Sequence, residues 1–495
     1  MTFNRIFVVL LWVILTLHPL GGESRAAKDT LASGTGVSKK EKPQDTRTLA
    51  KGQQSKALAH YAMGVIYDKE GKIDQAIGEY RKSLKYNPHS TQTRLKLGMD
   101  YLILGDDKRA VKEFELIKKT DSENVYARFL LALIYTSRGN FTEAQKEYEK
   151  IVEQEPGDLR ALSSLADIFV IQEKMESAEN VYEKLLEKDP ESAVLHFNLG
   201  IIYNRLGKRD KALVEMEEAV AKDPGYMEAY LMRGVLLEMN KDYEKAATSY
   251  KDALKIDPLD AKIYTRLGRV YSEAGKTEDA IKQYRIAISL SPEDIKGYVS
   301  LGYLYAGEKR YKEALDVLKD AVAKNPKNAM AYFYTGVIYE RMSSSLEAPS
   351  DGPPKEIAIK NFRKAIEFDP KFAEAYNYLA YTFAEDETNL DEAIELANKA
   401  LELEPDNGAY IDTLGWLYLK KGMIDEAVKE LERANDIEKE DSIIRDHLGD
   451  AYFEKGLFSK ARVQWEKSLE LNPDQEKVRQ KIKALKANKK MQGKE

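Results

Sequence analysis

Ala261–Asp294, AKIYTRLGRVYSEAGKTEDAIKQYRIAISLSPED, contains a pattern of spaced residues that recurs along most of the chain. The residue types that recur, with a period of 34 residues, are those of Tyr264, Leu267, Gly268, Tyr271, Gly275, Ala280, Tyr284, Ala287 and Pro292. A fixed period of this length is the signature of stacked supersecondary structures. The pattern therefore predicts a repeat protein in which each repeat packs on its neighbours.

The spacing within one repeat predicts two helices joined by a short turn. The apolar, small and aromatic residues of each half lie three and four residues apart, which places them on one face of a helix. Gly275 breaks the chain between the halves, and Thr277 is a candidate N-cap of the second helix. Pro292 ends the repeat, and its fixed φ angle suits the first position of the next helix. Most prolines between repeats follow Asn, Asp or Ser, which are good N-cap residues.

Two positions in every repeat carry only small side chains. The first is Gly or Ala, at residues 64, 98, 132, 166, 200, 234, 268, 302, 336, 380, 415 and 449. The second is Ala, at residues 76, 110, 144, 178, 212, 246, 280, 314, 358, 393, 427 and 461. Because Gly inside a helix costs about 1 kcal/mol relative to Ala, its recurrence predicts a close approach of the neighbouring helix.

These residues resemble the tetratricopeptide repeat (TPR) family. The resemblance extends over twelve repeats, residues 57–475, and implies an all-α, right-handed α-solenoid of twelve helix pairs. TPR proteins usually hold peptides or partner proteins, so the resemblance also implies a binding role. Residues 476–495 place Val478, Ile482 and Leu485 at helical spacing, which predicts a C-terminal capping helix followed by a basic tail.

Three further segments interrupt or precede the repeats. Residues 1–26 combine Arg5, an apolar run at 6–17 and small residues before a cleavage site after Ala26, which predicts a signal peptide. An uncleaved anchor is the alternative, although a transmembrane helix needs roughly 20 apolar residues. Residues 27–56 are poor in apolar side chains, so we expect a flexible linker. Residues 343–354, SSSLEAPSDGPP, form an insertion whose composition predicts a loop.

The composition excludes several classes of function. The 77 basic and 83 acidic residues give a net charge of −6, which argues against nucleic acid as the main partner. Without Cys, the chain can form no disulfide, thiolate nucleophile or lipid-modified N-terminal Cys. The five His residues lie far apart in the sequence, and no metal-binding or catalytic motif is present. We therefore expect no metal, no cofactor and no enzymatic activity.

The residues that could bind a partner are those that face the groove of a TPR solenoid. In the family, the first helix of each pair lines the concave surface. The resemblance predicts a partner-binding groove formed by Leu95, Met99, Phe129, Leu133, Phe197, Ile201, Leu231, Val235, Met239, Tyr303, Phe333, Tyr381 and Trp416. Exposed apolar residues on such a surface favour a binding site. The alternative is a tightly wound solenoid in which these side chains cover one another.

The last repeats are similar to those of bacterial envelope TPR proteins. The strings at 410–418 (YIDTLGWLY) and 446–452 (DHLGDAY) carry this similarity, and the group includes adaptors of periplasmic carboxy-terminal processing proteases. Together with the export segment, it implies a periplasmic or cell-envelope scaffold that binds proteins or peptides. The alternative is a structural component of a polysaccharide or pilus export machine, held at the inner membrane by an uncleaved N-terminal helix.

Overall fold

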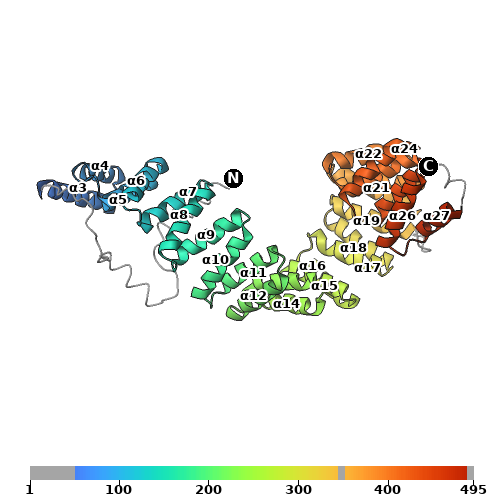
Figure 1. Cartoon of the computed structure of the whole chain (residues 1–495). Helices are drawn as coiled ribbons and strands as arrows, with labels where there is room; N and C mark the ends of the chain where they lie inside the picture. Colours follow the sequence, from blue (N-terminus) through green and yellow to red (C-terminus); the bar gives the residue numbers. More distant parts are fainter. Residues whose placement is uncertain (1–50, 344–351, 488–495) are drawn as a thin grey trace. The chain divides into compact units, whose positions relative to one another are not determined.

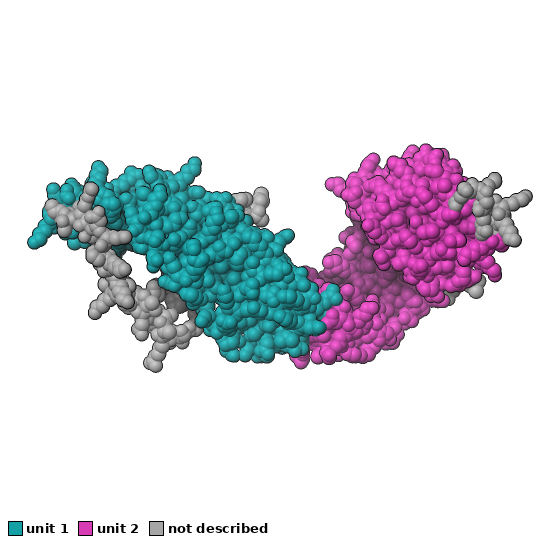
Figure 2. Space-filling view, viewed as in Figure 1, with its two compact units in different colours: residues 1–236 teal, residues 237–495 magenta. Residues whose placement is uncertain are grey.

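The structure is a computed structural model that describes residues 51–343 and 352–487, and the regular elements in these ranges are all α-helices (Figure 1). The chain divides into two compact units, an N-terminal unit of residues 1–236 and a C-terminal unit of residues 237–495 (Figure 2). The predicted signal peptide, most of the predicted linker and parts of the insertion and basic tail lie outside the described residues.

The first described helix is α3, and the boundary between the two units falls within α13. The helices from α3 to this boundary are α3 (Lys51–Lys69), α4 (Ile73–Tyr86), α5 (Thr91–Ile103), α6 (Asp107–Thr120), α7 (Val125–Ser137), α8 (Phe141–Gln154), α9 (Leu159–Ile171), α10 (Met175–Lys188), α11 (Ala193–Arg205), α12 (Arg209–Lys222) and α13 (Met227–Met239). Their lengths correspond to three to five helical turns, as the sequence period requires.

The C-terminal unit continues the alternation of first and second helices. Its helices are α14 (Tyr243–Ile256), α15 (Ala261–Glu273), α16 (Thr277–Leu290), α17 (Ile295–Gly307), α18 (Tyr311–Lys324), α19 (Ala329–Ser343), α20 (Pro354–Phe368), α21 (Ala373–Asp386), α22 (Leu390–Leu403), α23 (Gly408–Lys420), α24 (Ile424–Ile437), α25 (Ser442–Glu454), α26 (Phe458–Leu471) and α27 (Glu476–Ala487). The helix order corresponds to twelve pairs followed by one final helix, which confirms the predicted solenoid.

The two helices of each pair contact each other, and within the C-terminal unit neighbouring first helices also contact one another. Helix α15 contacts α16 as its partner and α17 as the next first helix, and α21, α23 and α25 follow the same order. The first helices of the C-terminal unit therefore share one face, which we call the first-helix face.

The recurring glycines lie where a helix approaches a large side chain of its partner. A Cβ atom at Gly268 would lie 2.6 Å from Cε1 of Tyr284, and one at Gly98 would lie 2.7 Å from Cζ of Phe114. Both distances are too short for carbon atoms in van der Waals contact. The close helix approach predicted from the small residues is thus confirmed, and the rings of Tyr284 and Phe114 fill the core between the helices.

The glycine turn agrees with the sequence pattern, but neither Thr277 nor the residue before the inter-repeat proline is the N-cap in this repeat. Gly275 has φ +71° and ends the first helix as expected. The side chain of Asp260, two residues after Pro258, accepts hydrogen bonds from the first amides of α15. The inter-repeat proline therefore lies in the connecting turn, where its φ angle is also favoured. Thr277 is already the first residue of α16, so Lys276 occupies the N-cap position without a side-chain cap.

The ends of the described segments refine the predicted boundaries. Helix α3 begins at Lys51, so residues 51–56 are helical and exposed rather than part of the predicted linker. The insertion is flanked by Ser343, the last residue of α19, and Pro354, the first of α20. None of the helices in the described ranges is long and apolar enough to cross a membrane.

Helix α27 caps the final pair as predicted. Its three apolar residues Val478, Ile482 and Leu485 are buried in one cluster with residues of α25 and α26. Without α27, this apolar surface of the last pair would face water.

Candidate functional site

The predicted groove residues of the N-terminal unit lie on first helices, but neighbouring side chains cover much of their surface. The half-buried members are Leu95, Met99, Phe129, Leu133, Phe197, Ile201, Leu231 and Val235. Phe129 meets Tyr148 edge-on with ring centroids 5.8 Å apart, and the ring of Phe197 lies 5.0 Å from that of Tyr226. The expectation of freely exposed side chains is therefore corrected, because adjacent elements pack against these rings.

The predicted groove residues of the C-terminal unit differ in exposure. Met239 is 46% exposed, whereas Tyr303, Tyr381 and Trp416 are half-buried. The ring of Tyr303 meets Tyr334 edge-on at 5.3 Å. The last two of these residues, Tyr381 and Trp416, belong to a larger aromatic arrangement on α21, α23 and α25.

Phe333 is not a groove residue, so this prediction is wrong. Phe333 lies on α19, and its side chain is fully buried. Its ring centroid lies 5.8 Å from that of Phe362 on the paired helix, 4.9 Å from that of Phe372 and 5.1 Å from that of Tyr378. The bulky aromatic ring gains more from this apolar cluster than from an open surface.

A stack of three rings runs across the first helices of the last three pairs. The centroids of Tyr381 and Trp416 lie 5.2 Å apart at an angle of 40°. Trp416 and His447 lie 4.7 Å apart and are nearly parallel, with 7° between the planes. The stack joins α21, α23 and α25 along the first-helix face.

Carboxylates surround the buried imidazole of His447. Its Nδ1 lies 3.0 Å from both carboxylate oxygens of Asp412. Burial opposes protonation, but the negative charges of Asp412, Asp446 and Asp450 outweigh it and raise the pKa of His447. The protonated ring is thereby favoured, and it lies against the face of Trp416, an arrangement that a cation–π attraction stabilises.

The capping helix contributes a cation to the same network. The ammonium group of Lys481 lies 2.7 Å from an oxygen of Asp446 and 2.7 Å from an oxygen of Asp450. The indole nitrogen of Trp465 donates a hydrogen bond of 3.0 Å to Asp450. Burial raises the pKa of Asp450, and the charge of Asp446 adds to this effect. Lys481 and Trp465 compensate for the buried negative charge and fix the carboxylate in place.

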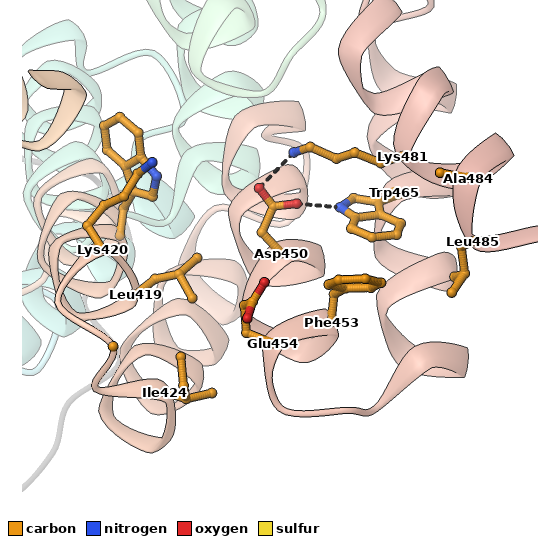
Figure 3. Close-up of a pocket in the computed structure, with 12 residues that line it drawn as sticks. Leu419, Lys420, Ile424, Asp450, Phe453, Glu454, Trp465, Lys481, Ala484 and Leu485 are labelled. Atoms are coloured by element: carbon orange, nitrogen blue, oxygen red, sulfur yellow. Dashed lines mark hydrogen bonds and ion pairs between the residues drawn. The ribbon is translucent and has the colours of Figure 1, made fainter. Parts of the chain in front are cut away.

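A pocket of about 630 Å³ opens beside this network, and we call it the C-terminal pocket. Its lining residues are Trp416, Leu419, Lys420, Gly422, Ile424, Asp450, Phe453, Glu454, Trp465, Lys481, Ala484 and Leu485. Phe453, Trp465 and Leu485 lie on one side, and Leu419, Lys420 and Ile424 lie opposite (Figure 3). Aromatic walls with a few charged groups are typical of sites that bind a side chain of a partner.

A second pocket of about 430 Å³ lies on the same unit, and we call it the tyrosine pocket. Its lining residues are Val337, Glu340, Arg341, Asn377, Tyr378, Tyr381, Ala409, Asp412, Thr413, Asp441, Ile443 and Ile444. Asp412 lines this pocket and contacts His447, while Trp416 lines the C-terminal pocket and stacks on the same imidazole. The His447 network therefore connects the walls of the two pockets.

The charged side chains around His447 are paired with one another. Within the described residues, no group of three or more His, Cys, Asp or Glu side chains could hold a metal ion. The carboxylates around His447 are engaged by the imidazole, Lys481 and Trp465. In the parts of the chain that the structure describes, the hydrogen bonds of this imidazole are those to Asp412.

Sequence models of the tetratricopeptide repeat match most of the chain. Six overlapping matches of one model lie between residues 95 and 348, and three other models match residues 57–90, 361–395 and 384–446. The chain belongs to the tetratricopeptide repeat family. This membership confirms the resemblance inferred from the spaced residues, and TPR scaffolds are typical of protein–protein interaction.

Individual TPR relatives match either a short part of the chain or the fold alone. A TPR repeat-containing protein of Pseudomonas aeruginosa is 40% identical over 65 residues, which are 13% of this chain and only 11% of that protein. Yeast Tom70 is 18% identical with a TM-score of 0.44, covering 87% of this chain and 99% of that chain. A chain of the structure of Naa15/Naa10 bound to HypK-THB is 17% identical with a TM-score of 0.44, covering 84% and 68%. These similarities concern the repeat, and we infer no partner from them.

The sequence analysis missed the residues that complete the two TPR pockets. His447 was grouped with isolated histidines, because its contacts Asp412 and Trp416 lie in another repeat. Trp465 follows the small Gly449 by 16 residues, the spacing of Tyr284 after Gly268, which indicates a core residue. The structure shows that Trp465 serves both roles, with its ring in the core and one edge in the pocket.

Proposed function

We propose that this TPR protein binds a segment of a partner protein through the C-terminal pocket. The observation that carries the proposal is the pocket of about 630 Å³, where the aromatic rings of Trp416, Phe453 and Trp465 surround a space that no described side chain fills. Interface anchors are commonly aromatic or aliphatic side chains inserted into such pockets. The occupant is an apolar side chain of the partner, since the walls are mainly apolar.

The proposal includes a location in the bacterial cell envelope. The supporting features are the charged, apolar and small-residue regions of residues 1–26, in the order of a secretory signal. In that setting the protein would act as an exported scaffold, and delivery of substrates to an envelope protease is one such role. Cell fractionation and N-terminal sequencing test the location. We expect a mature protein that begins at Ala27, and an intact Met1 on an inner-membrane species would support the anchored export component instead.

Selection of peptides from a random phage-displayed library on the full-length protein tests the binding function. We expect selected peptides to share an apolar anchor residue and to bind the wild-type protein in a direct measurement such as fluorescence anisotropy. Phe453→Ala should weaken this binding by about 30-fold, which corresponds to an anchor contribution of about 2 kcal/mol.

Phe368→Ala is the matched control, because Phe368 is also half-buried in the C-terminal unit but lines neither pocket. It should leave peptide binding unchanged. Equal loss of binding in both variants would indicate general destabilisation, and selection of no peptide by the wild-type protein would contradict the proposed function.

A further inference from the structure

The tyrosine pocket has a different chemistry from the C-terminal pocket. Its floor and walls come from the first helices α19, α21 and α23 and from the start of α25. The rings of Tyr378 and Tyr381 provide aromatic surface, while Glu340 and Asn377 provide polar atoms. The question is which partner group this combination would stabilise.

Carboxylates beside the pocket lack cationic partners. Within residues 51–343 and 352–487, Glu340, Glu374 and Glu385 form no ion pair, and Glu385 only accepts a hydrogen bond of 3.4 Å from the hydroxyl of Tyr381. Burial raises the pKa of Glu340, and the charge of Glu385 adds to this effect. Burial likewise raises the pKa of Glu374. A cation brought into the pocket would relieve this unfavourable burial of negative charge.

The cations already near the pocket do not balance this charge. The guanidinium of Arg341 lies 5.0 Å from the ring centroid of Tyr303, and its charge lowers the pKa of Glu340 without outweighing burial. Lys355 pairs with Asp386. The imidazole of His447, which does not line the pocket, is held by Asp412.

Asn377 supplies an independent sign of a missing donor. Its side chain is only 8% exposed, and its Oδ1 atom is buried without a hydrogen-bond partner in the described structure. Buried polar atoms in folded proteins are almost always paired. A donor that enters the tyrosine pocket and turns the amide toward itself would satisfy this group.

We propose that the tyrosine pocket binds the cationic side chain of a lysine or arginine in the partner segment. The proposal rests on the binding function proposed above. The positive group would lie beside the Glu340 carboxylate, donate to the amide oxygen of Asn377 and contact the faces of Tyr378 and Tyr381, where cation–π attraction adds to the ion pair. The partner segment would thus place an apolar residue in one pocket and a basic residue in the other.

Small amides test the cation site without any assumption about the partner. N-acetyl-arginine amide and N-acetyl-lysine amide are titrated into the full-length protein and followed by saturation-transfer NMR, with N-acetyl-glutamine amide as the neutral comparison. We expect both cations to bind at least about tenfold more tightly than the glutamine amide, as charge-assisted hydrogen bonds imply. Glu340→Gln and Asn377→Leu should each remove most of this preference.

Glu395→Gln is the matched control, since Glu395 is exposed on α22 and lines neither pocket. It should leave the cation preference intact. Circular dichroism melting checks that each variant is folded, and the two pocket variants provide independent tests if one of them is unstable. Equal binding of arginine, lysine and glutamine amides, or an unchanged preference in both pocket variants, would overturn the proposal.

The peptide selection separates this proposal from the proposed function. Both proposals are supported if the selected peptides carry a basic residue at a fixed distance from the apolar anchor and this enrichment disappears when Glu340→Gln is used for the selection. Selected peptides without basic enrichment contradict the cation site but retain the binding function. Cation binding without any selected peptide supports the site and contradicts the proposed function.

Discussion

At the scale of single residues, the small positions are not equivalent, although their spacing is identical. A Cβ atom at Gly449 would lie 2.5 Å from Nε1 of Trp465, a buried ring that its hydrogen bond to Asp450 holds in place. At Gly302 the nearest atom, Cγ of Leu318, lies 3.5 Å from the Cβ position, which is an ordinary contact. Gly415 has a Leu 16 residues later as Gly302 does, yet a Cβ atom at Gly415 would lie 2.7 Å from Cγ of Leu431. How closely the opposing side chain approaches, and not its size alone, therefore decides whether Ala is tolerated.

Two glycine substitutions test this difference. Gly302→Ala should stabilise the protein by up to about 1 kcal/mol, because Ala is the better helix former and meets no obstacle. Gly449→Ala should destabilise it by about 1–3 kcal/mol through overpacking against Trp465. Urea unfolding of both variants measures the change, and the same sign for both would contradict the argument.

A buried acid beside a second carboxylate in the N-terminal unit predicts a pH-dependent stability. Burial raises the pKa of Asp100 to about 7, and the neighbouring carboxylate of Asp68 adds to the shift. The pKa of Asp100 in the folded protein lies above its ordinary value of 3.8, so this group favours folding at low pH, and the benefit is lost as the pH rises toward 7. Asp68 is itself held by a hydrogen bond of 2.5 Å from the hydroxyl of Tyr80.

Asp100→Asn should remove this dependence while keeping a donor toward Asp68. One pKa unit corresponds to about 1.4 kcal/mol, so the variant should gain on the order of 2 kcal/mol more stability at pH 8 than at pH 5, relative to wild type. Urea unfolding of both proteins at the two pH values provides the measurement. The same stability difference between Asp100→Asn and wild type at pH 5 and at pH 8 would show that the Asp100 carboxyl does not titrate as described.

At the scale of elements, α27 combines two functions, because its apolar residues close the core and Lys481 reaches the network beside the C-terminal pocket.

Ile482→Ser should lower the free energy of unfolding by about 2–4 kcal/mol, since it removes a buried side chain and leaves a cavity. Lys483→Ser changes the exposed face of the same helix and should stay within about 0.5 kcal/mol of wild type. Hydrogen exchange of the Ile482→Ser variant should show loss of amide protection in α25–α27 only. Loss of protection that also reaches α14, at the start of the C-terminal unit, would contradict a local capping role.

At the scale of the whole molecule, a solenoid should transmit damage only to its neighbours. Tyr271 is buried in α15, a helix that contacts α14, α16 and α17. Tyr271→Ser should therefore speed amide exchange in these four helices and leave α23–α26 protected. Mass-spectrometric hydrogen exchange measures this directly, and uniform loss of protection across the C-terminal unit would show coupling beyond the nearest neighbours.

The architecture of this protein could be predicted from its amino-acid sequence. The 34-residue period, the small positions and the glycine turns predicted the helix pairs and the final cap, because each of these features depends on contacts within a repeat or between adjacent repeats. The resemblance to the TPR family also placed all thirteen predicted groove residues on first helices. The sequence could not show that the inter-repeat prolines lie in turns rather than at helix starts, since both positions suit their φ angle.

Which side chains meet across repeats could not be predicted in this way, because it depends on how successive helix pairs pack. Phe333 is buried because rings from α20, α21 and the turn before α21 close over it, and the spacing within one repeat does not contain this information. The stack of Tyr381, Trp416 and His447 likewise depends on how successive first helices pack. Charges placed 31 and 35 residues apart, as in Asp450 and Asp446 with Lys481, become neighbours only after that packing. The pockets arise from these contacts, so composition and period determine the scaffold, and three-dimensional packing determines the site.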